Sequence, residues 1–126
     1  MMNKELKDRT QRFSLEIIKF TEILPKTKTC DVLGRQLLRS ACSIGANYRA
    51  ALRSQSHTHF ISKIGTVEEE ADESLFWLEM LYMAGINKSE QIKTLMQEAN
   101  ELTAIFTSTR KTARINQNSK SKLKNK

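Results

Sequence analysis

The sequence has little of what turns and membrane segments require. It holds one proline and four glycines in 126 residues, whereas a β-sandwich or barrel needs a turn signal roughly every ten residues. No run of about eighteen apolar residues occurs, which excludes a transmembrane helix. The charged start MMNKELKDRTQR lacks the apolar core of a secretory signal. We therefore expect a cytoplasmic, all-α protein that does not enter a membrane.

Residue patterns that carry catalysis or bind metals are also missing. Cys30 and Cys42 show neither CxxC spacing nor the density of a disulfide scaffold, so we expect both to be reduced and buried. No Glu-x-x-His for a di-iron site occurs, and no GxGxxG, GxxxxGK[ST] or GxSxG motif. His57 and His59 stand in a polar segment, where solvated residues are favoured over a metal site. We predict no catalytic residue, no metal and no cofactor, and hence a protein that is not an enzyme.

Apolar residues recur every three or four positions in four segments, the spacing of amphipathic helices. The stripes run from Leu6 to Leu24, Leu33 to Tyr48, Phe60 to Tyr82 and Ile92 to Phe106. Short polar connections separate them, and the length suits one domain. The pattern predicts an antiparallel up-down-up-down four-helix bundle over residues 1–114.

A few residues predict where the helices end and how closely they pack. Pro25 ends the first segment, and Gly85 is a natural stop for the third. Asn87, with a glutamate three residues on, reads as a capping box for the fourth segment. Because glycine weakens a helix by about 1 kcal/mol, Gly34 and Gly45 inside the second segment indicate that another helix backbone approaches closely.

The net charge of +7 comes from the C-terminal part of the chain. Residues 1–109 balance their charges, and the excess is Arg110, Lys111, Arg114, Lys120, Lys122, Lys124 and Lys126. We expect residues 115–126 to be a disordered basic tail, because they lack apolar periodicity. Such a tail either neutralises the phosphates of RNA or is only a solvated terminus, and the sequence leaves both open.

Four arginines form a row in the second helix. At 100° per residue Arg35, Arg39, Arg49 and Arg53 fall within about 80° of one another, opposite the apolar stripe. One hypothesis is contact with RNA phosphates, which guanidinium groups fit well. The favoured alternative is pairing with the acidic run of the third helix, Glu68 to Glu79, within the chain or across a subunit boundary.

The stretch LFWLEMLYM in the third helix is apolar on nearly every side. A helix that packs on its own core needs only one apolar stripe, so the extra residues predict a self-association face. A wider core with a few exposed apolar residues is the alternative. The candidate interface residues are Phe76, Trp77, Met80 and Met83, with Leu15 and Ile18 on the first helix.

The segments LLRSACSIGANYRAA and EEADESLFWLEML, within residues 5–106, resemble the four-helix-bundle proteins encoded in intervening sequences of bacterial 23S rRNA genes. The resemblance implies a closed ring, typically a pentamer, with no known enzymatic activity. Accessory variability proteins of diversity-generating retroelements are more distantly similar, and they are basic rings that bind nucleic acid and a reverse transcriptase. The resemblance implies that the residues matching the family pattern form contacts between helices or between subunits. They are Arg39, Ser40, Ser43, Asn47, Glu69, Glu73 and Trp77.

The chain departs from the family pattern at one position. Many relatives carry a glutamate three residues after the asparagine, where this chain has Ala50, so any role of that acid is absent. The sequence leads us to two hypotheses: a homo-oligomeric bundle that binds RNA through a basic face and its tails, or a protein-interaction scaffold without a nucleic-acid role.

Overall fold

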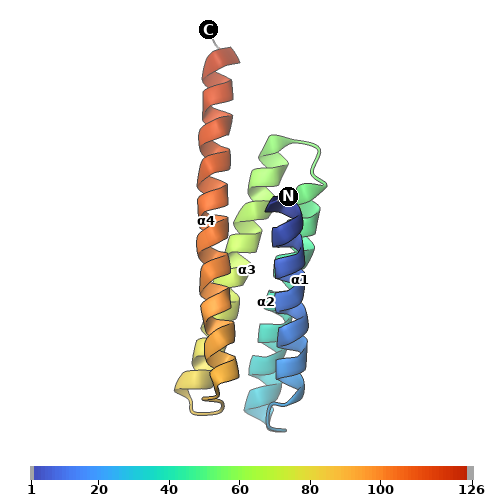
Figure 1. The fold of residues 1–126 in the computed structure, drawn as a ribbon, viewed down its shortest axis with the longest axis vertical. Coiled ribbons are helices and arrows are strands. Elements are labelled where there is room, and N and C mark those ends of the chain that lie inside the picture. The colour runs from blue at the N-terminus through green and yellow to red at the C-terminus, as the bar shows by residue number, and fades with distance from the viewer. Residues whose placement is uncertain (1, 125–126) are drawn as a thin grey trace.

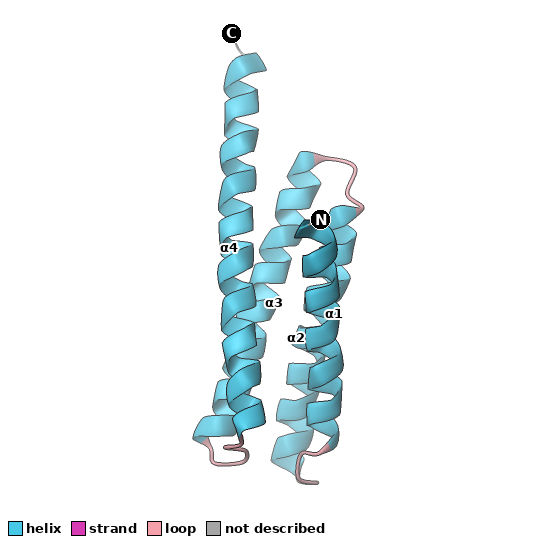
Figure 2. Cartoon of the chain, viewed as in Figure 1, coloured by secondary structure: helices cyan, strands magenta, loops and turns pink. Residues whose placement is uncertain are grey.

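The computed structural model describes residues 2–124, and the side chains of residues 3–119 among them. Four helices and no strand make up this range (Figure 2): α1 (Met2–Glu22), α2 (Lys28–Leu52), α3 (His57–Met83) and α4 (Glu90–Lys124). Successive helices run in opposite directions (Figure 1). The predicted all-α, up-down-up-down four-helix bundle is confirmed.

The bundle has an upper and a lower end, named by their place in Figure 1. The upper end holds the start of α1, the α2–α3 loop and the last turns of α4, and the lower end holds the other two loops. Each helix packs against its neighbours in the chain, and α1 also touches α4, so α1 and α3 lie diagonally across the bundle.

The helix starts are capped by hydroxyl side chains. Thr27 and Ser56, which precede α2 and α3, each accept a hydrogen bond at 3.1 Å from the N–H three residues on. The capping box predicted at Asn87 is wrong. Ser89 caps α4 by accepting from the N–H of Ile92 at 3.3 Å, while the Asn87 carboxamide oxygen accepts from the Ser89 N–H at 3.0 Å. The turn before α4 is longer than the pattern indicated.

The stop predicted at Gly85 is confirmed. This glycine has a φ of +75°, a left-handed conformation that costs other residues free energy. The N–H of Ile86 then donates to the carbonyl oxygen of Leu81 at 3.1 Å. That bond satisfies a carbonyl at the end of α3 and turns the chain toward α4.

The four predicted apolar stripes meet in one core. Tyr48 of α2 and Phe106 of α4 contact each other edge to face, with ring centroids 5.2 Å apart. The largest fully buried side chains are Phe13, Phe20, Phe106, Ile17, Leu37, Ile44, Ile64, Leu78, Leu81, Ile92, Leu95 and Leu102. All four helices contribute, so none of them can be removed without opening the core.

Small and hydroxylated residues bring the helices close together. The Ser14 hydroxyl of α1 donates to the carbonyl oxygen of Ala41 in α2 at 3.0 Å. A Cβ atom on Gly45 would lie 3.7 Å from the backbone of α1 at Thr10, which confirms the predicted close approach there. A Cβ atom on Gly34 would instead meet the side chain of Leu24, which lies in the loop between α1 and α2.

Helix α4 continues to Lys124, past the boundary expected at Arg114. His57 Nε2 lies 2.8 Å from the Ala113 carbonyl oxygen, and Gln117 Nε2 donates to Thr58 Oγ1 at 2.8 Å. For residues 115–124 this differs from the disordered tail we expected, and residues 125–126 lie outside the described range. No proline or glycine follows Gly85, and the lysines and the glutamine of residues 115–124 favour helix even without an apolar stripe.

Candidate nucleic-acid interface

The arginine row of α2 lies on the outer surface, on the side turned away from the core. Arg35, Arg39, Arg49 and Arg53 are all exposed. Arg39 alone is paired: Nη1 lies 3.1 Å from Glu70 Oε2, and Nη2 bonds Glu73. The Trp77 indole N–H also donates to Glu73, at 3.0 Å. The acidic run of α3 therefore uses one of the four arginines within the chain.

The other three arginines have no carboxylate partner among residues 3–119. Arg35 lies in the lower half of α2, whereas Arg49 lies in its last turn and Arg53 is its C-cap, both at the upper end. Exposed, unpaired guanidinium groups keep their donors free for phosphate oxygens or for another protein's carboxylates. Only Arg49 and Arg53 share the upper end with other basic segments.

The end of α2, the start of α3 and the end of α4 meet at the upper end, and none of these three segments contains an acidic residue. Residues 44–67, which hold Arg49, Arg53 and Lys63, form the end of α2 and the start of α3. Residues 104–119, which hold Arg110, Lys111 and Arg114, lie beside them, held by the contacts of Ala113 and Gln117 described above. The backbone of α4 then carries Lys120, Lys122 and Lys124 beyond the other helices (Figure 1), and Lys126 lies outside the described residues.

The predicted basic residues of α4 do not all behave alike. Lys111 and Arg114 are exposed. Arg110 bends back to α3, where its Nε donates to Glu68 Oε1 at 2.6 Å, and Thr107 donates to the same carboxylate. These bonds, that of Arg110 foremost, hold the pKa of Glu68 below its ordinary value. Arg110 thus fixes α4 on α3, and its donors are less available to an RNA than those of its neighbours.

Acidic residues gather away from the upper end. From the middle of α3 to the middle of α4 only Lys88 and Lys93 offset the acids. These are Glu68, Glu69, Glu70, Asp72, Glu73, Glu79, Glu90, Glu98 and Glu101. The first turns of α1 contribute both signs to the upper end. The charges of the bundle are therefore segregated along its length, a feature that the charge balance of residues 1–109 conceals.

One arginine outside the predicted row also has a structural role. Arg9 of α1 reaches across to α4, where it bonds Glu98 through Nε and Nη2 at 2.7 and 2.6 Å and Glu101 at 3.1 Å. The bonds to Glu98 contribute most to raising the pKa of Arg9 above its ordinary value. Since α1 and α4 otherwise touch little, this cluster helps to close the bundle.

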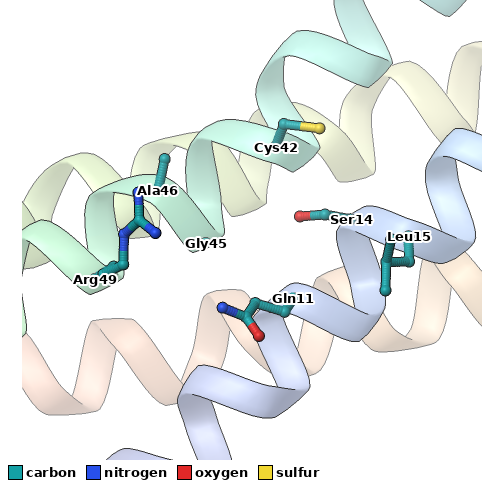
Figure 3. Close-up of a pocket in the computed structure, with 7 residues that line it drawn as sticks. All are labelled: Gln11, Ser14, Leu15, Cys42, Gly45, Ala46 and Arg49. Atoms are coloured by element: carbon teal, nitrogen blue, oxygen red, sulfur yellow. The ribbon is translucent and has the colours of Figure 1, made fainter.

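The outer surface between α1 and α2 is hollowed into a groove of about 430 Å³ (Figure 3). Its walls are Gln11, Ser14, Leu15, Cys42, Gly45, Ala46 and Arg49. Burial raises the pKa of the Cys42 thiol, so the thiol stays protonated at neutral pH. The small side chains of α2 leave the space, and Leu15 and Arg49 give the groove an apolar and a basic rim.

The predicted interface residues divide into exposed and half-buried ones. Leu15 and Ile18 are 58% and 39% exposed, and Phe76 and Met83 are 47% and 72% exposed. Trp77 and Met80 are half-buried. Sequence reasoning missed two exposed apolar residues at the lower end, Ile23 and Val32, and one on α4, Ile115. Their positions off the core stripes were the available signal.

The part of the chain that the structure describes has neither a metal-binding cluster nor a membrane-spanning helix. No group of three or more His, Cys, Asp or Glu side chains is placed to hold a metal ion. No helix is long and apolar enough to cross a membrane.

Comparison with known proteins agrees with the resemblance seen in the sequence. A model of the 23S rRNA-intervening sequence protein family matches residues 3–108. A crystal structure of a protein of unknown function from the S23 ribosomal protein family of Bacteroides thetaiotaomicron is similar, with a TM-score of 0.80 and 32% sequence identity. The similarity covers 88% of this chain and 99% of that chain. No curated protein matches.

Proposed function

This chain belongs to the family of 23S rRNA-intervening sequence proteins, and on that premise we propose that it is a non-enzymatic, homo-oligomeric bundle that binds RNA through its upper end. The observation that carries this proposal is the meeting of acid-free basic segments from α2, α3 and α4 at one end. A surface with a large excess of basic residues attracts the phosphate backbone without reading its sequence. An RNA ligand also implies a cytoplasmic location.

Assembly strengthens such binding. The family resemblance is our basis for proposing a pentamer, in which each copy contributes one basic end. Several weak contacts on one ring then act at a high effective concentration, provided that one RNA reaches more than one of them. The missing catalytic motifs are our basis for proposing that the protein is not an enzyme.

Salt dependence provides the test. A fluorescein-labelled fragment of structured rRNA is titrated with the protein, and anisotropy is followed at about 50 and 200 mM salt. If four or five phosphates are neutralised, the single-strand slope of about −0.7 per phosphate predicts a roughly 50- to 130-fold loss of affinity between the two salts. No binding at the lower salt would remove RNA from the proposal.

A truncation after Ser119 separates the tail from the bundle. It removes the four lysines from Lys120 to Lys126 but keeps Arg110 with Glu68 and Gln117 with Thr58. We expect weaker binding and a shallower salt slope, with some binding left in Arg53, Lys111 and Arg114. Unchanged affinity would show that the tail is only a solvated terminus.

The second candidate is a protein-interaction scaffold without a nucleic-acid role. The pairing of Arg39 with Glu70 and Glu73 favours it, because an arginine held by two carboxylates is not free for phosphate. An oligomer that fails to bind RNA at low salt would make this candidate the better one.

A further inference from the structure

Two exposed apolar surfaces lie on opposite sides of the bundle. One is the α1–α2 face, formed by Leu15, Ile18 and the groove beside them. The other is the α3 face, which carries Phe76 and Met83. Since α1 and α3 lie diagonally across the bundle, the two faces point away from each other. No single partner surface of this size covers both at once.

The two faces lie at the same level along the bundle. Ser14, next to Leu15, bonds the Ala41 carbonyl oxygen of α2. In the adjacent position of α2, the Ser40 hydroxyl accepts from Ser74 of α3 at 2.9 Å. Phe76 is two residues from Ser74. Two copies standing side by side in the same orientation therefore bring Leu15 of one copy to the height of Phe76 of the other.

Charges of opposite sign stand at the two faces. Arg49 of α2 lines the groove of the α1–α2 face, and Asp72 and Glu69 lie four and seven residues before Phe76, on the same side of α3. All three side chains are exposed, and none has an ion pair among residues 3–119. Packing the α3 face against a second copy of itself would place its carboxylates together, whereas packing it against the α1–α2 face sets them opposite Arg49.

We propose that the α1–α2 face of one copy binds the α3 face of the next, in a head-to-tail contact that repeats around the oligomer. This inference rests on the homo-oligomer of the proposed function and names the surfaces that form it. A contact between two different faces leaves one of each free in any open chain, so the assembly ends only by closing into a ring. Because the copies share one orientation, all upper ends lie on one side of that ring.

Two variants that each block one face test the proposal. Leu15→Glu places a negative charge opposite Glu69 and Asp72 of the next copy, and Phe76→Lys places a positive charge opposite Arg49. Both positions are exposed, and unchanged helicity and thermal midpoint confirm that each variant folds. Ile115→Lys on α4 serves as the matched control, because Ile115 is also exposed and lies on neither face.

Light scattering gives the outcome. Each blocked variant alone is expected to fall to the 14.5 kDa monomer, while the control keeps the mass of the unmodified protein. A mixture of the two variants should form a dimer or a larger assembly, because each supplies the face that the other lacks and the two introduced charges are opposite. A variant that still assembles alone, a mixture that stays monomeric, or a monomeric unmodified protein would overturn the proposal. If the unmodified protein forms the ring but does not bind RNA, the proposed function is wrong, whereas the proposed interface still holds.

Discussion

The glycines inside the helices allow a quantitative test of the packing. Alanine is favoured over glycine in a helix by about 1 kcal/mol, and the neighbours of each glycine decide how much of that gain survives. A Cβ at Gly65 of α3 would lie 3.7 Å from Arg110 Cδ, an ordinary contact. Gly65→Ala should therefore stabilise the protein by about 1 kcal/mol. At Gly34 the Cβ would lie 3.2 Å from Leu24 Cδ1, so repacking of this buried leucine should cancel most of the gain.

Gly85 is the opposite case. With a φ of +75°, it occupies a conformation that costs an alanine about 1 kcal/mol or more, so Gly85→Ala should destabilise. Urea unfolding at one fixed protein concentration measures all three variants, because the stability of an oligomer depends on concentration. We expect Gly65→Ala to be the most stable of the three variants, Gly34→Ala the next and Gly85→Ala the least stable. A destabilised Gly65→Ala or a stabilised Gly85→Ala would contradict the packing described for these glycines.

Three further predictions concern the pH dependence, the thiol and the core. The lowered pKa of Glu68 implies a stabilisation that is fully present above the ordinary pKa of a glutamate and is lost as the pH falls through the lower pKa of the folded state. Glu68→Gln should therefore be less stable than the unmodified protein at pH 7. The difference between their urea midpoints should shrink as the pH falls toward 3. Cys42 should be alkylated faster in Phe76→Lys than in the intact ring, as mass spectrometry can follow, because loss of the α3 face uncovers the groove of the neighbouring copy; equal rates would contradict the interface. Phe106→Ala should cost about 3 to 5 kcal/mol by leaving a cavity against Tyr48, measured by urea unfolding, and a loss under 1 kcal/mol would show that the core is looser than described.

The sequence predicted the fold well, because helix formation and burial leave local patterns. The apolar stripes of three- and four-residue spacing mark the buried faces of all four helices, and Gly85 ends α3 with the expected left-handed turn. The cap of α4 was misplaced by two residues because both Asn87 and Ser89 are good capping residues. Which of them caps is decided by the course of the turn, not by residue type.

The end of α4 was harder to predict. A helix without an apolar stripe has no core to pack on, and the sequence after Arg114 has none. The contacts that continue the packing are polar ones, between Gln117 and Thr58 and between His57 and the Ala113 backbone. Single hydrogen bonds of this kind leave no periodic signal.

The candidate interface was predicted in its residues but not in its arrangement. A helical wheel places Arg35 to Arg53 on one face, yet it does not show that only Arg39 reaches Glu70 and Glu73. Likewise, the acid-free segments 44–67 and 104–119 are far apart in the chain, and only the fold brings them together. Tertiary distances of this kind cannot be read from the spacing within one helix.

Two pairs of arginine substitutions test whether RNA binds at the upper end. Arg53→Gln with Arg114→Gln removes charge from the upper end, and Arg35→Gln with Arg39→Gln removes the same charge lower on α2. RNA affinity is measured by anisotropy across a salt series, with the oligomeric mass of each variant checked by light scattering. If RNA binds at the upper end, the first pair weakens binding and reduces the magnitude of the salt slope by about 1.4, from about 0.7 per lost phosphate contact. The second pair, while the ring stays intact, leaves the slope unchanged. Equal effects of the two pairs, or no effect of the first, would contradict RNA binding through the upper end.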